Sequence, residues 1–303
     1  MPKKAEDTVM WFSLAVAIVL LLAKVTAAGL TGSSSIYSDA AESVVHLFAV
    51  AFAAWALRFS RKPADESHHY GHDKAAFLSS GFEGAMISVA AVLIIYDAVK
   101  QFFTGVAIEH LGVGAAITGG ALVVNLVLGI SLKSVGKKRS SMVLVSNGTH
   151  VLTDVWTSAA VLMALALYHF TGWPWWDPLI AIAAALNIMR SGWGLIRQSM
   201  SGLMDASDPV VENQIRELLD REATGSGLAY HNLRHRHSGR IQWVEFHLVF
   251  DDETSVRDAH HKATILEGLV ADLLKPDGRV ISHLEPKSAE NRQEEWEKSP
   301  DSK

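Results

Sequence analysis

The stretch MVLVSNGTHVLTDVWTSAAVLMALALYHF, residues 142–170, is apolar enough to lie in lipid, yet it carries His150 and Asp154. Because these residues are four apart, their side chains share one face of a helix. An earlier apolar stretch carries Glu42 and His46 at the same spacing. Ionisable groups inside a membrane are costly and mark functional sites. Two imidazoles and two carboxylates suit a tetrahedral divalent cation, so the sequence predicts a transition-metal site partway across a bilayer.

Composition divides the chain of 303 residues into two parts. Up to about Met200 the chain is dominated by Ala, Val, Leu, Ile, Gly and Trp, and after Asp205 it is charged and polar. We therefore expect a transmembrane domain over residues 1–204, a soluble domain over residues 205–288 and a charged, disordered tail over residues 289–303. The net charge of −5 comes without a basic stripe, so no nucleic-acid partner is expected. The chain has no cysteine, so any metal must be held by His, Asp and Glu.

Six segments approach the ~20 mostly apolar residues that a membrane-crossing helix needs. The fourth contains no charged residue, whereas Lys24 interrupts the first and Glu83, Asp97 and Lys100 interrupt the third. The predicted spans are Val9–Leu30, Ile36–Leu57, Gly81–Phe103, Leu111–Leu132, Met142–Phe170 and Pro178–Ile196.

Positive charges in the loops predict the orientation of these spans. Lys and Arg residues precede the first span and follow the second and fourth, whereas the other loops have none. The positive-inside rule then places both termini in the cytoplasm. No small-residue cleavage site follows the first apolar run, so we expect a retained helix rather than a signal peptide.

The residues after Asp205 predict a small soluble domain with the order α-β-β-α-β. Asp208-Pro209 begins a helix, Ser238-Gly239 joins two strands in a hairpin, and Ser255 caps a second helix. This order makes an α+β domain with a sheet covered on one face by helices. The predicted strands are Tyr230–His237, Ile241–Phe250 and Arg279–Leu284.

Two further clusters could hold a cation. In the loop after the second span, Asp65, His68, His69 and His72 fall within eight residues and can converge on one ion, although a polar loop without metal is the alternative. In the soluble domain, histidines gather at the ends of predicted neighbouring strands and on the second helix, which favours a metal site over an ordinary surface. These residues are His231, His235, His237, His247, His260, His261, His283 and Glu285.

Several motifs together resemble the cation diffusion facilitators, a family of proton-coupled divalent-metal exporters, over nearly the whole chain. In the spans and loop they are Gly32-Ser-Ser-Ser-Ile-Tyr-Ser-Asp-Ala, Lys62-Pro-Ala-Asp, His69-Tyr-Gly-His72, His150-Val-Leu-Thr-Asp154, Trp176-Asp-Pro and Gly202-Leu-Met-Asp205. In the tail they are Leu233-Arg-His-Arg and Val280-Ile-Ser-His-Leu-Glu. The resemblance implies six all-α spans, a metallochaperone-like cytoplasmic domain, a homodimer and a location in the bacterial inner membrane.

The resemblance also assigns roles to individual residues. It implies a transport site of Glu42, His46, His150 and Asp154, a loop site of Asp65, His68 and His72, and a cytoplasmic site of His231, His247, His260, His283 and Glu285. Lys74 and Asp205 fall on an interlocking charge pair, and Asp39 is an accessory residue that could replace a ligand.

The transport site departs from the family's pattern, because relatives usually place Asp at position 46 and Asp, His, Asn or Tyr at position 42. Two nitrogens and two oxygens remain, and these suit Zn²⁺, Co²⁺, Ni²⁺ or Fe²⁺ better than Mn²⁺ or Mg²⁺.

The expected function is export of Zn²⁺, or of a similar divalent cation, in exchange for protons. A membrane metalloenzyme is disfavoured because the chain contains no His-Glu-x-x-His motif, so we expect no enzyme activity. A membrane metal sensor is the other alternative, and the polar pairs deep in two spans argue against spans that only anchor the protein.

Overall fold

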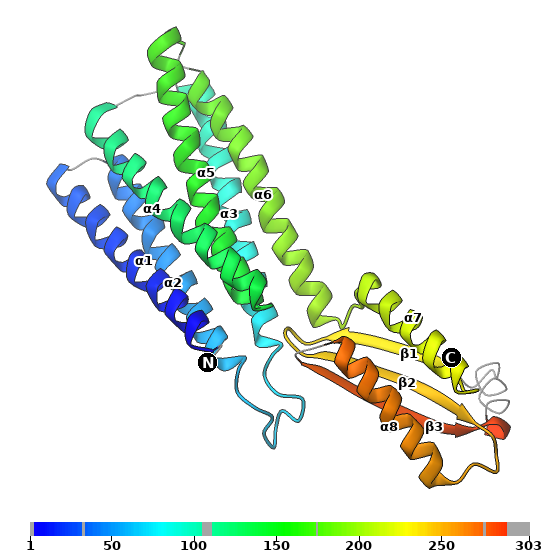
Figure 1. The fold of residues 1–303 in the computed structure, drawn as a ribbon. Coiled ribbons are helices and arrows are strands. Elements are labelled where there is room, and N and C mark those ends of the chain that lie inside the picture. Colours follow the sequence, from blue (N-terminus) through cyan, green and yellow to red (C-terminus); the bar gives the residue numbers. More distant parts are fainter. Residues whose placement is uncertain (1–2, 32–33, 105–110, 174, 275–276, 290–303) are drawn as a thin grey trace. The chain divides into compact units, whose positions relative to one another are not determined.

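A computed structural model describes the chain in two compact units, Met1–Ser201 and Gly202–Lys303 (Figure 1). The described residues are 3–31, 34–104, 111–173, 175–274 and 277–289. Some helix side chains, those of residues 27–42 and 111–118 among them, lie outside this description, as does the predicted tail from residue 290 onward.

Six long helices form the first unit, as predicted. They are α1 (Lys3–Thr31), α2 (Ser34–Phe59), α3 (Ala75–Thr104), α4 (Leu111–Lys138), α5 (Met142–Thr171) and α6 (Trp176–Leu203). Within the described residues, four of these helices contain stretches long and apolar enough to cross a membrane, and α2 contains the shorter apolar stretch His46–Phe59. The four stretches are Glu6–Ala23, Ala75–Lys100, Gly119–Lys138 and Pro178–Leu203.

Glycines allow these helices to approach closely. A Cβ atom on Gly136 of α4 would lie 2.8 Å from the backbone nitrogen of Val145 in α5. A Cβ atom on Gly84 of α3 would lie 2.8 Å from the carbonyl oxygen of Gly192 in α6. Small residues at such crossings permit the close van der Waals packing that joins helices in lipid. These contacts pair α4 with α5 and α3 with α6.

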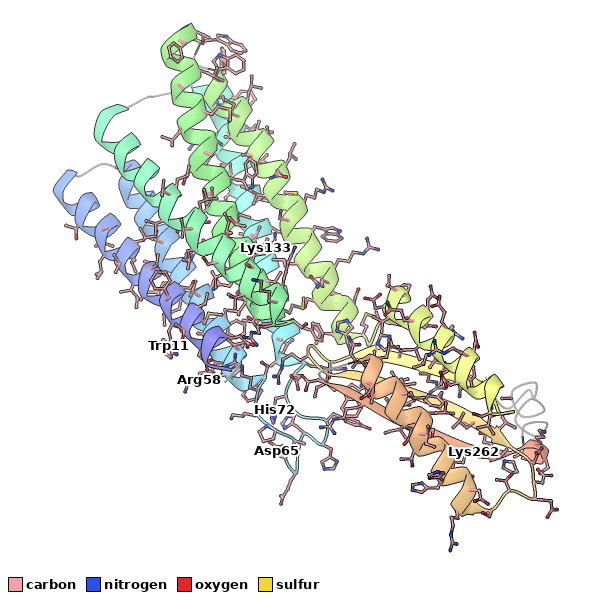
Figure 2. All side chains as sticks on the ribbon, in the orientation of Figure 1. Trp11, Arg58, Asp65, His72, Lys133 and Lys262 are labelled. Carbon is pink, nitrogen blue, oxygen red and sulfur yellow. The ribbon has the colours of Figure 1, made fainter. Side chains whose placement is uncertain are left out.

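Charged and aromatic side chains fix the start of α1 against the end of α2. Arg61, just after α2, forms ion pairs with both Glu6 and Asp7. One turn earlier, the Arg58 guanidinium lies over the ring of Trp11, 5.9 Å from its centroid (Figure 2). The loop that carries the predicted Asp65 cluster therefore begins at a fixed point.

Buried polar groups add contacts inside the bundle. The Asn147 side-chain amide of α5 donates to the Ser13 hydroxyl of α1 at 3.2 Å, and the Ser80 hydroxyl of α3 lies 2.9 Å from that of Ser146 in α5. Asn147 is only 1% exposed, so the Asn-Gly-Thr sequence at this position lies inside the helix bundle.

The second unit has the predicted order of helices and strands. It contains α7 (Pro209–Gly225), β1 (Ala229–His237), β2 (Gln242–Phe250), α8 (Val256–Leu273) and β3 (Gly278–Pro286). The central strand β2 pairs antiparallel with β1 and parallel with β3. Ser255 caps α8 as expected, because its hydroxyl accepts a hydrogen bond from the Asp258 backbone at 3.1 Å.

Alternation along β2 decides which face of the sheet is covered. Val244, Phe246, Leu248 and Phe250 are buried and pack with residues of α7 and α8 in one hydrophobic core. Side chains at the intervening positions point to the opposite face, because successive residues of a strand alternate. His247 lies on that opposite face.

Candidate metal centres

The structure brings three of the four predicted transport ligands together inside the helical unit. His46 comes from α2, and His150 and Asp154 come from one face of α5. The His46 Nδ1 atom lies 3.0 Å from Asp154 Oδ2, and the two imidazole rings meet edge to face with centroids 4.7 Å apart. One ligand atom of each residue lies within 4.8 Å of the others. Glu42 and Asp39, which the sequence also predicted here, have side chains outside the described residues.

A buried nitrogen atom without a hydrogen bond makes this cluster suitable for a cation. His150 is 9% exposed, and its buried Nδ1 atom has no hydrogen-bond partner among the residues that the structure describes. A metal ion accepts the lone pair of such a nitrogen and replaces the missing hydrogen bond. Tetrahedral ligands about 2.0–2.2 Å from Zn²⁺ would stand closer together than 4.8 Å, so the cluster needs only a modest contraction to bind.

A small cavity adjoins the cluster on the side of α1 and α4. His46 and Asp154 lie on its wall together with three polar side chains that sequence reasoning missed, Ser13, Ser43 and Asn125. Asn125 is the one side-chain amide in a predicted span without charged residues, and the sequence could have indicated its role in this way. The cavity gives the cluster room for water beside the ligands.

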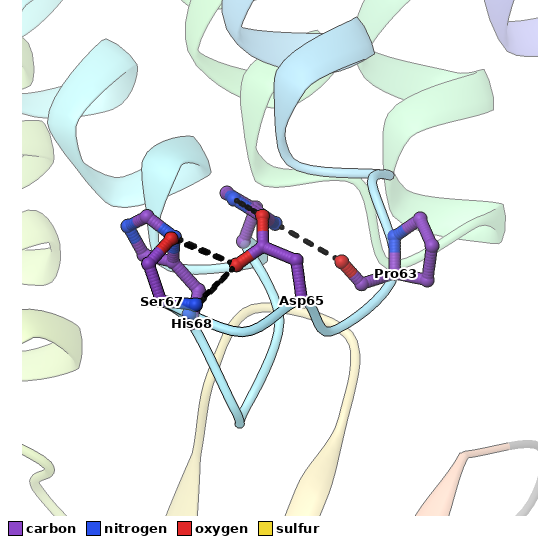
Figure 3. A network of polar contacts seen from close by, with 5 residues as sticks. Pro63, Asp65, Ser67 and His68 are labelled. Atoms are coloured by element: carbon purple, nitrogen blue, oxygen red, sulfur yellow. Dashed lines mark hydrogen bonds and ion pairs between the residues drawn. The ribbon is translucent and has the colours of Figure 1, made fainter.

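The loop between α2 and α3 forms the second predicted cluster, which Figure 3 shows from close by. Asp65 Oδ1 lies 3.1 Å from His68 Nδ1, and Asp65 Oδ2 lies 3.4 Å from His72 Nε2. His72 is buried, and its Nδ1 atom lies 3.2 Å from the Pro63 carbonyl oxygen. That contact directs the Nε2 atom of His72 toward Asp65.

Hydrogen bonds fix the Asp65 carboxylate before any metal binds. The Ser67 hydroxyl donates at 3.0 Å, and the backbone amide of His68 donates at 2.8 Å (Figure 3). The Ser67 hydroxyl is the main cause that lowers the pKa of Asp65 to about 2. Asp65 is therefore ionised at neutral pH, as a metal ligand must be.

The third predicted cluster lies on the uncovered face of the sheet. His231 on β1, His247 on β2 and His283 on β3 stand opposite one another in a single row of paired residues. Glu285 lies two residues beyond His283, so it points to the same face. Its carboxylate contacts His231 Nε2 at 3.0 Å, His247 Nδ1 at 2.7 Å and His283 Nε2 at 3.5 Å.

Glu285 is the centre of this cluster. It is only 4% exposed, and although burial raises its pKa, the hydrogen bond from His231 and the charge of His247 lower the pKa of Glu285 below its ordinary value overall. His247 Nδ1 and Glu285 Oε1 are both buried and close, yet they lack the geometry of a hydrogen bond. An imidazole nitrogen and a carboxylate oxygen are atoms of the kind that bind Zn²⁺.

A β-bulge supports the cluster and was not predicted. The register between β1 and β2 shifts between His231 and Arg234, and Asn232 adopts a positive φ of 52°. Its side-chain amide lies 3.3 Å from His247 Nε2, which leaves the Nδ1 atom of His247 directed at Glu285. Asn tolerates this backbone region better than most residues, which was the available signal.

The structure does not bring every predicted residue to a cluster. His260 is exposed on α8. Among the described residues, the close group of ligands consists of His231, His247 and Glu285 and does not include His260. Asp205 lies 3.4 Å from Arg236 Nη1 within the second unit. The metal-binding role of His260 and the pairing of Lys74 with Asp205 stay predictions.

Comparison with known proteins agrees with the two units. Residues 10–204 match the family model of the cation efflux transmembrane domain, and residues 208–287 match that of the cytoplasmic domain of cation efflux proteins. The chain therefore belongs to the cation efflux family, the cation diffusion facilitators. It is a membrane-spanning transporter of divalent metal cations, and the family is one of transporters rather than enzymes.

Individual relatives cover most of the chain. An uncharacterized transporter of Synechocystis sp. is 35% identical over 274 residues, which are 90% of this chain and 88% of the relative. The cation-efflux pump FieF of Serratia proteamaculans is 31% identical over 93% of this chain and 94% of its own. A solved structure described as the Zn form of CzrB, a putative zinc transporter, is 31% identical to this chain. The match covers 28% of this chain and 93% of the CzrB chain, with a TM-score of 0.26.

Proposed function

We propose that this transporter exports Zn²⁺ from the cytoplasm in exchange for protons, by alternating access of one metal site in the membrane. The observation that carries the proposal is the convergence of His46, His150 and Asp154 from two separate helices. Two imidazole nitrogens and a carboxylate oxygen, with Glu42 as a fourth ligand, match the donors that Zn²⁺ prefers. The same donors also accept Co²⁺, Ni²⁺, Fe²⁺ and Cd²⁺.

Proton exchange follows from the chemistry of these ligands. An imidazole must be neutral and a carboxylate ionised to hold a metal, so metal and protons compete for the same atoms. The contact between His46 Nδ1 and Asp154 Oδ2 at 3.0 Å supports this competition, because a proton shared there occupies two ligand atoms at once. Protons that reach the site from the outer side would then displace the cation and reset the carrier.

The orientation of the protein follows from its loop charges. Both termini lie in the cytoplasm of a bacterium, and the helices cross its inner membrane. The loop between α2 and α3 then faces the cytoplasm, where Asp65, His68 and His72 are placed to capture metal near the entrance. Asp65 supports this role because it is ionised and held in place before metal arrives.

We propose that residues 1–204 transport the metal and that residues 205–288 regulate transport as part of a homodimer. Zinc bound by His231, His247, His283 and Glu285 would stabilise the cytoplasmic domains of two chains in one arrangement, with His260 as a further ligand. Lys74 and Asp205 would form a charge pair where the membrane domain meets the cytoplasmic domain.

Metal uptake into proteoliposomes tests the proposal. Zn²⁺, Co²⁺, Ni²⁺, Fe²⁺, Cd²⁺ and Mn²⁺ are offered under an imposed pH gradient to the wild type, to Asp154→Ala and to Asp97→Ala. Asp97 is an exposed carboxylate on α3, so its substitution is the matched control. Zn²⁺ uptake that only Asp154→Ala abolishes supports the proposal, whereas intact metal binding without flux of any metal favours a membrane sensor.

A further inference from the structure

Glu83 is a buried carboxyl group that none of the three metal clusters uses. It lies in α3, inside an apolar stretch able to cross a membrane, and its exposed fraction is 1%. Both carboxyl oxygens are buried, and neither has a hydrogen-bond partner among the described residues. An intramembrane ionisable residue in such a position marks a functional site.

Among the described residues, the surroundings of Glu83 offer hydroxyl groups and no positive charge. Ser146 of α5 faces the carboxyl group. The Ser146 hydroxyl is bonded to Ser80 and to the Met142 carbonyl oxygen, at 2.9 and 2.8 Å. On the other side of α3, Gly84 packs against α6, whose arginines Arg190 and Arg197 are exposed.

The titratable groups nearest along the neighbouring helices belong to the metal cluster. His150 lies four residues after Ser146, so the two project from the same face of α5 about 6 Å apart along its axis. In the middle of α2, His46 is the titratable group among the described side chains. Asp73 and Lys74 lie before the first residue of α3. Ser146, which faces Glu83, therefore lies one helical turn from His150, on the side of the loop between α4 and α5.

An ionised carboxylate without a partner is strongly disfavoured in such surroundings, whereas the neutral acid is tolerated. A fixed negative charge at this place would also attract the transported cation away from its ligands. We propose that Glu83 is a proton-binding site of the transport domain, which holds a proton while α3 and α5 enclose it and releases the proton to water when the helices separate. This inference rests on the proposed exchange of metal for protons.

The chemistry is a simple proton transfer. A carboxylate oxygen takes a proton from a hydronium ion in the water that enters the open bundle, and the O–H bond breaks to return that proton to water in the next opening. Glu83 would thus add about one proton to those displaced from the metal ligands in each cycle.

Infrared difference spectroscopy of the full-length protein in lipid tests the protonation directly. We expect the carbonyl band of a protonated carboxyl group in the wild type, its loss in Glu83→Gln and its displacement in Glu83→Asp. Glu83→Asp keeps the group titratable if the Gln variant fails to fold. A wild-type spectrum without a band that responds to either substitution would overturn the proposal.

Proton counting with Zn²⁺ tests whether that proton takes part in transport. Protons moved per Zn²⁺ in proteoliposomes should fall by about one in Glu83→Gln and stay at the wild-type ratio in Asp97→Asn, while the affinity for Zn²⁺ is unchanged. Equal ratios in the wild type and Glu83→Gln would overturn the inference. If the wild type exchanges no protons for Zn²⁺, the proposed function fails, and the infrared band alone then decides whether Glu83 binds a proton.

Discussion

Within the described residues, the membrane cluster and the cytoplasmic cluster each contain a close group of two imidazoles and one carboxylate, but the two groups are built differently. In the membrane, His46 stands on one helix, His150 and Asp154 stand on another, and the Asp154 side chain is 32% exposed beside a cavity. In the cytoplasmic domain, paired strands place the ligands, and the side chain of the central Glu285 is 5% exposed.

This difference matches two uses of metal. A site made by two helices changes its geometry when either helix moves, so it can bind an ion on one side and release it on the other. A site made by hydrogen-bonded strands keeps its geometry, so in the proposed regulation it would report metal concentration by its occupancy. The comparison predicts that substitutions in the first cluster abolish transport and that substitutions in the second change its regulation.

The largest effect is expected for His150→Ala. Loss of an imidazole from the membrane cluster should lower Zn²⁺ flux in proteoliposomes by about 100-fold or more, since even supporting residues of metal sites contribute 10- to 100-fold. Equilibrium dialysis should still find metal on the cytoplasmic domain. Flux that survives this substitution would remove the membrane cluster from the transport path.

The next effect is expected for Glu285→Ala, because this carboxylate contacts all three histidines of the sheet. The affinity of the cytoplasmic cluster for Zn²⁺ should fall about 10- to 100-fold, whereas flux at saturating Zn²⁺ should persist. Glu253→Ala, which removes an exposed carboxylate from the same domain, is the matched control. If Glu285→Ala abolished flux at every Zn²⁺ concentration, the two clusters would not have separate roles.

Sequence alone predicted the parts of both clusters that depend on local periodicity. The four-residue spacing of His150 and Asp154 places them on one helix face, and the hairpin at Ser238-Gly239 places β1 beside β2. The pairing of His231 with His247 depends on the register shift between His231 and Arg234, which the sequence did not predict. The positions that residues take through packing of separate elements were harder to predict from the sequence. The sequence cannot say that α8 covers the face of the sheet opposite His247, so the place of His260 relative to the cluster could not be predicted.

The bulge at Asn232 was also not predicted from the sequence. It allows a test of whether the cytoplasmic cluster depends on the orientation of His247. Asn232→Gly keeps the positive φ but removes the amide beside His247 Nε2, and Asn232→Ala removes the amide and strains the backbone. Both should weaken Zn²⁺ binding about 10-fold, measured by calorimetry, with Asn232→Ala also less stable to heat. Wild-type affinity in Asn232→Gly would show that the amide does not orient His247.

The smallest effect concerns the loop, which precedes the membrane cluster in the proposed route. Ser67→Ala removes the main cause that lowers the pKa of Asp65, so that pKa should rise from about 2 toward its ordinary value of 3.8. Because the folded-state pKa is lowered, the stabilising contribution of Asp65 is complete above its ordinary value and is lost as the pH falls through about 2. Carboxyl carbon chemical shifts of labelled protein measure the change, and an unchanged titration would contradict the assigned cause.

The most direct test of the central claim is the direction of Zn²⁺ movement in proteoliposomes when the imposed pH gradient is reversed. If protons and Zn²⁺ compete for His46, His150 and Asp154, net Zn²⁺ movement reverses with the gradient in the wild type and disappears in His150→Ala. Zn²⁺ movement that keeps its direction and rate whatever the gradient would contradict the account.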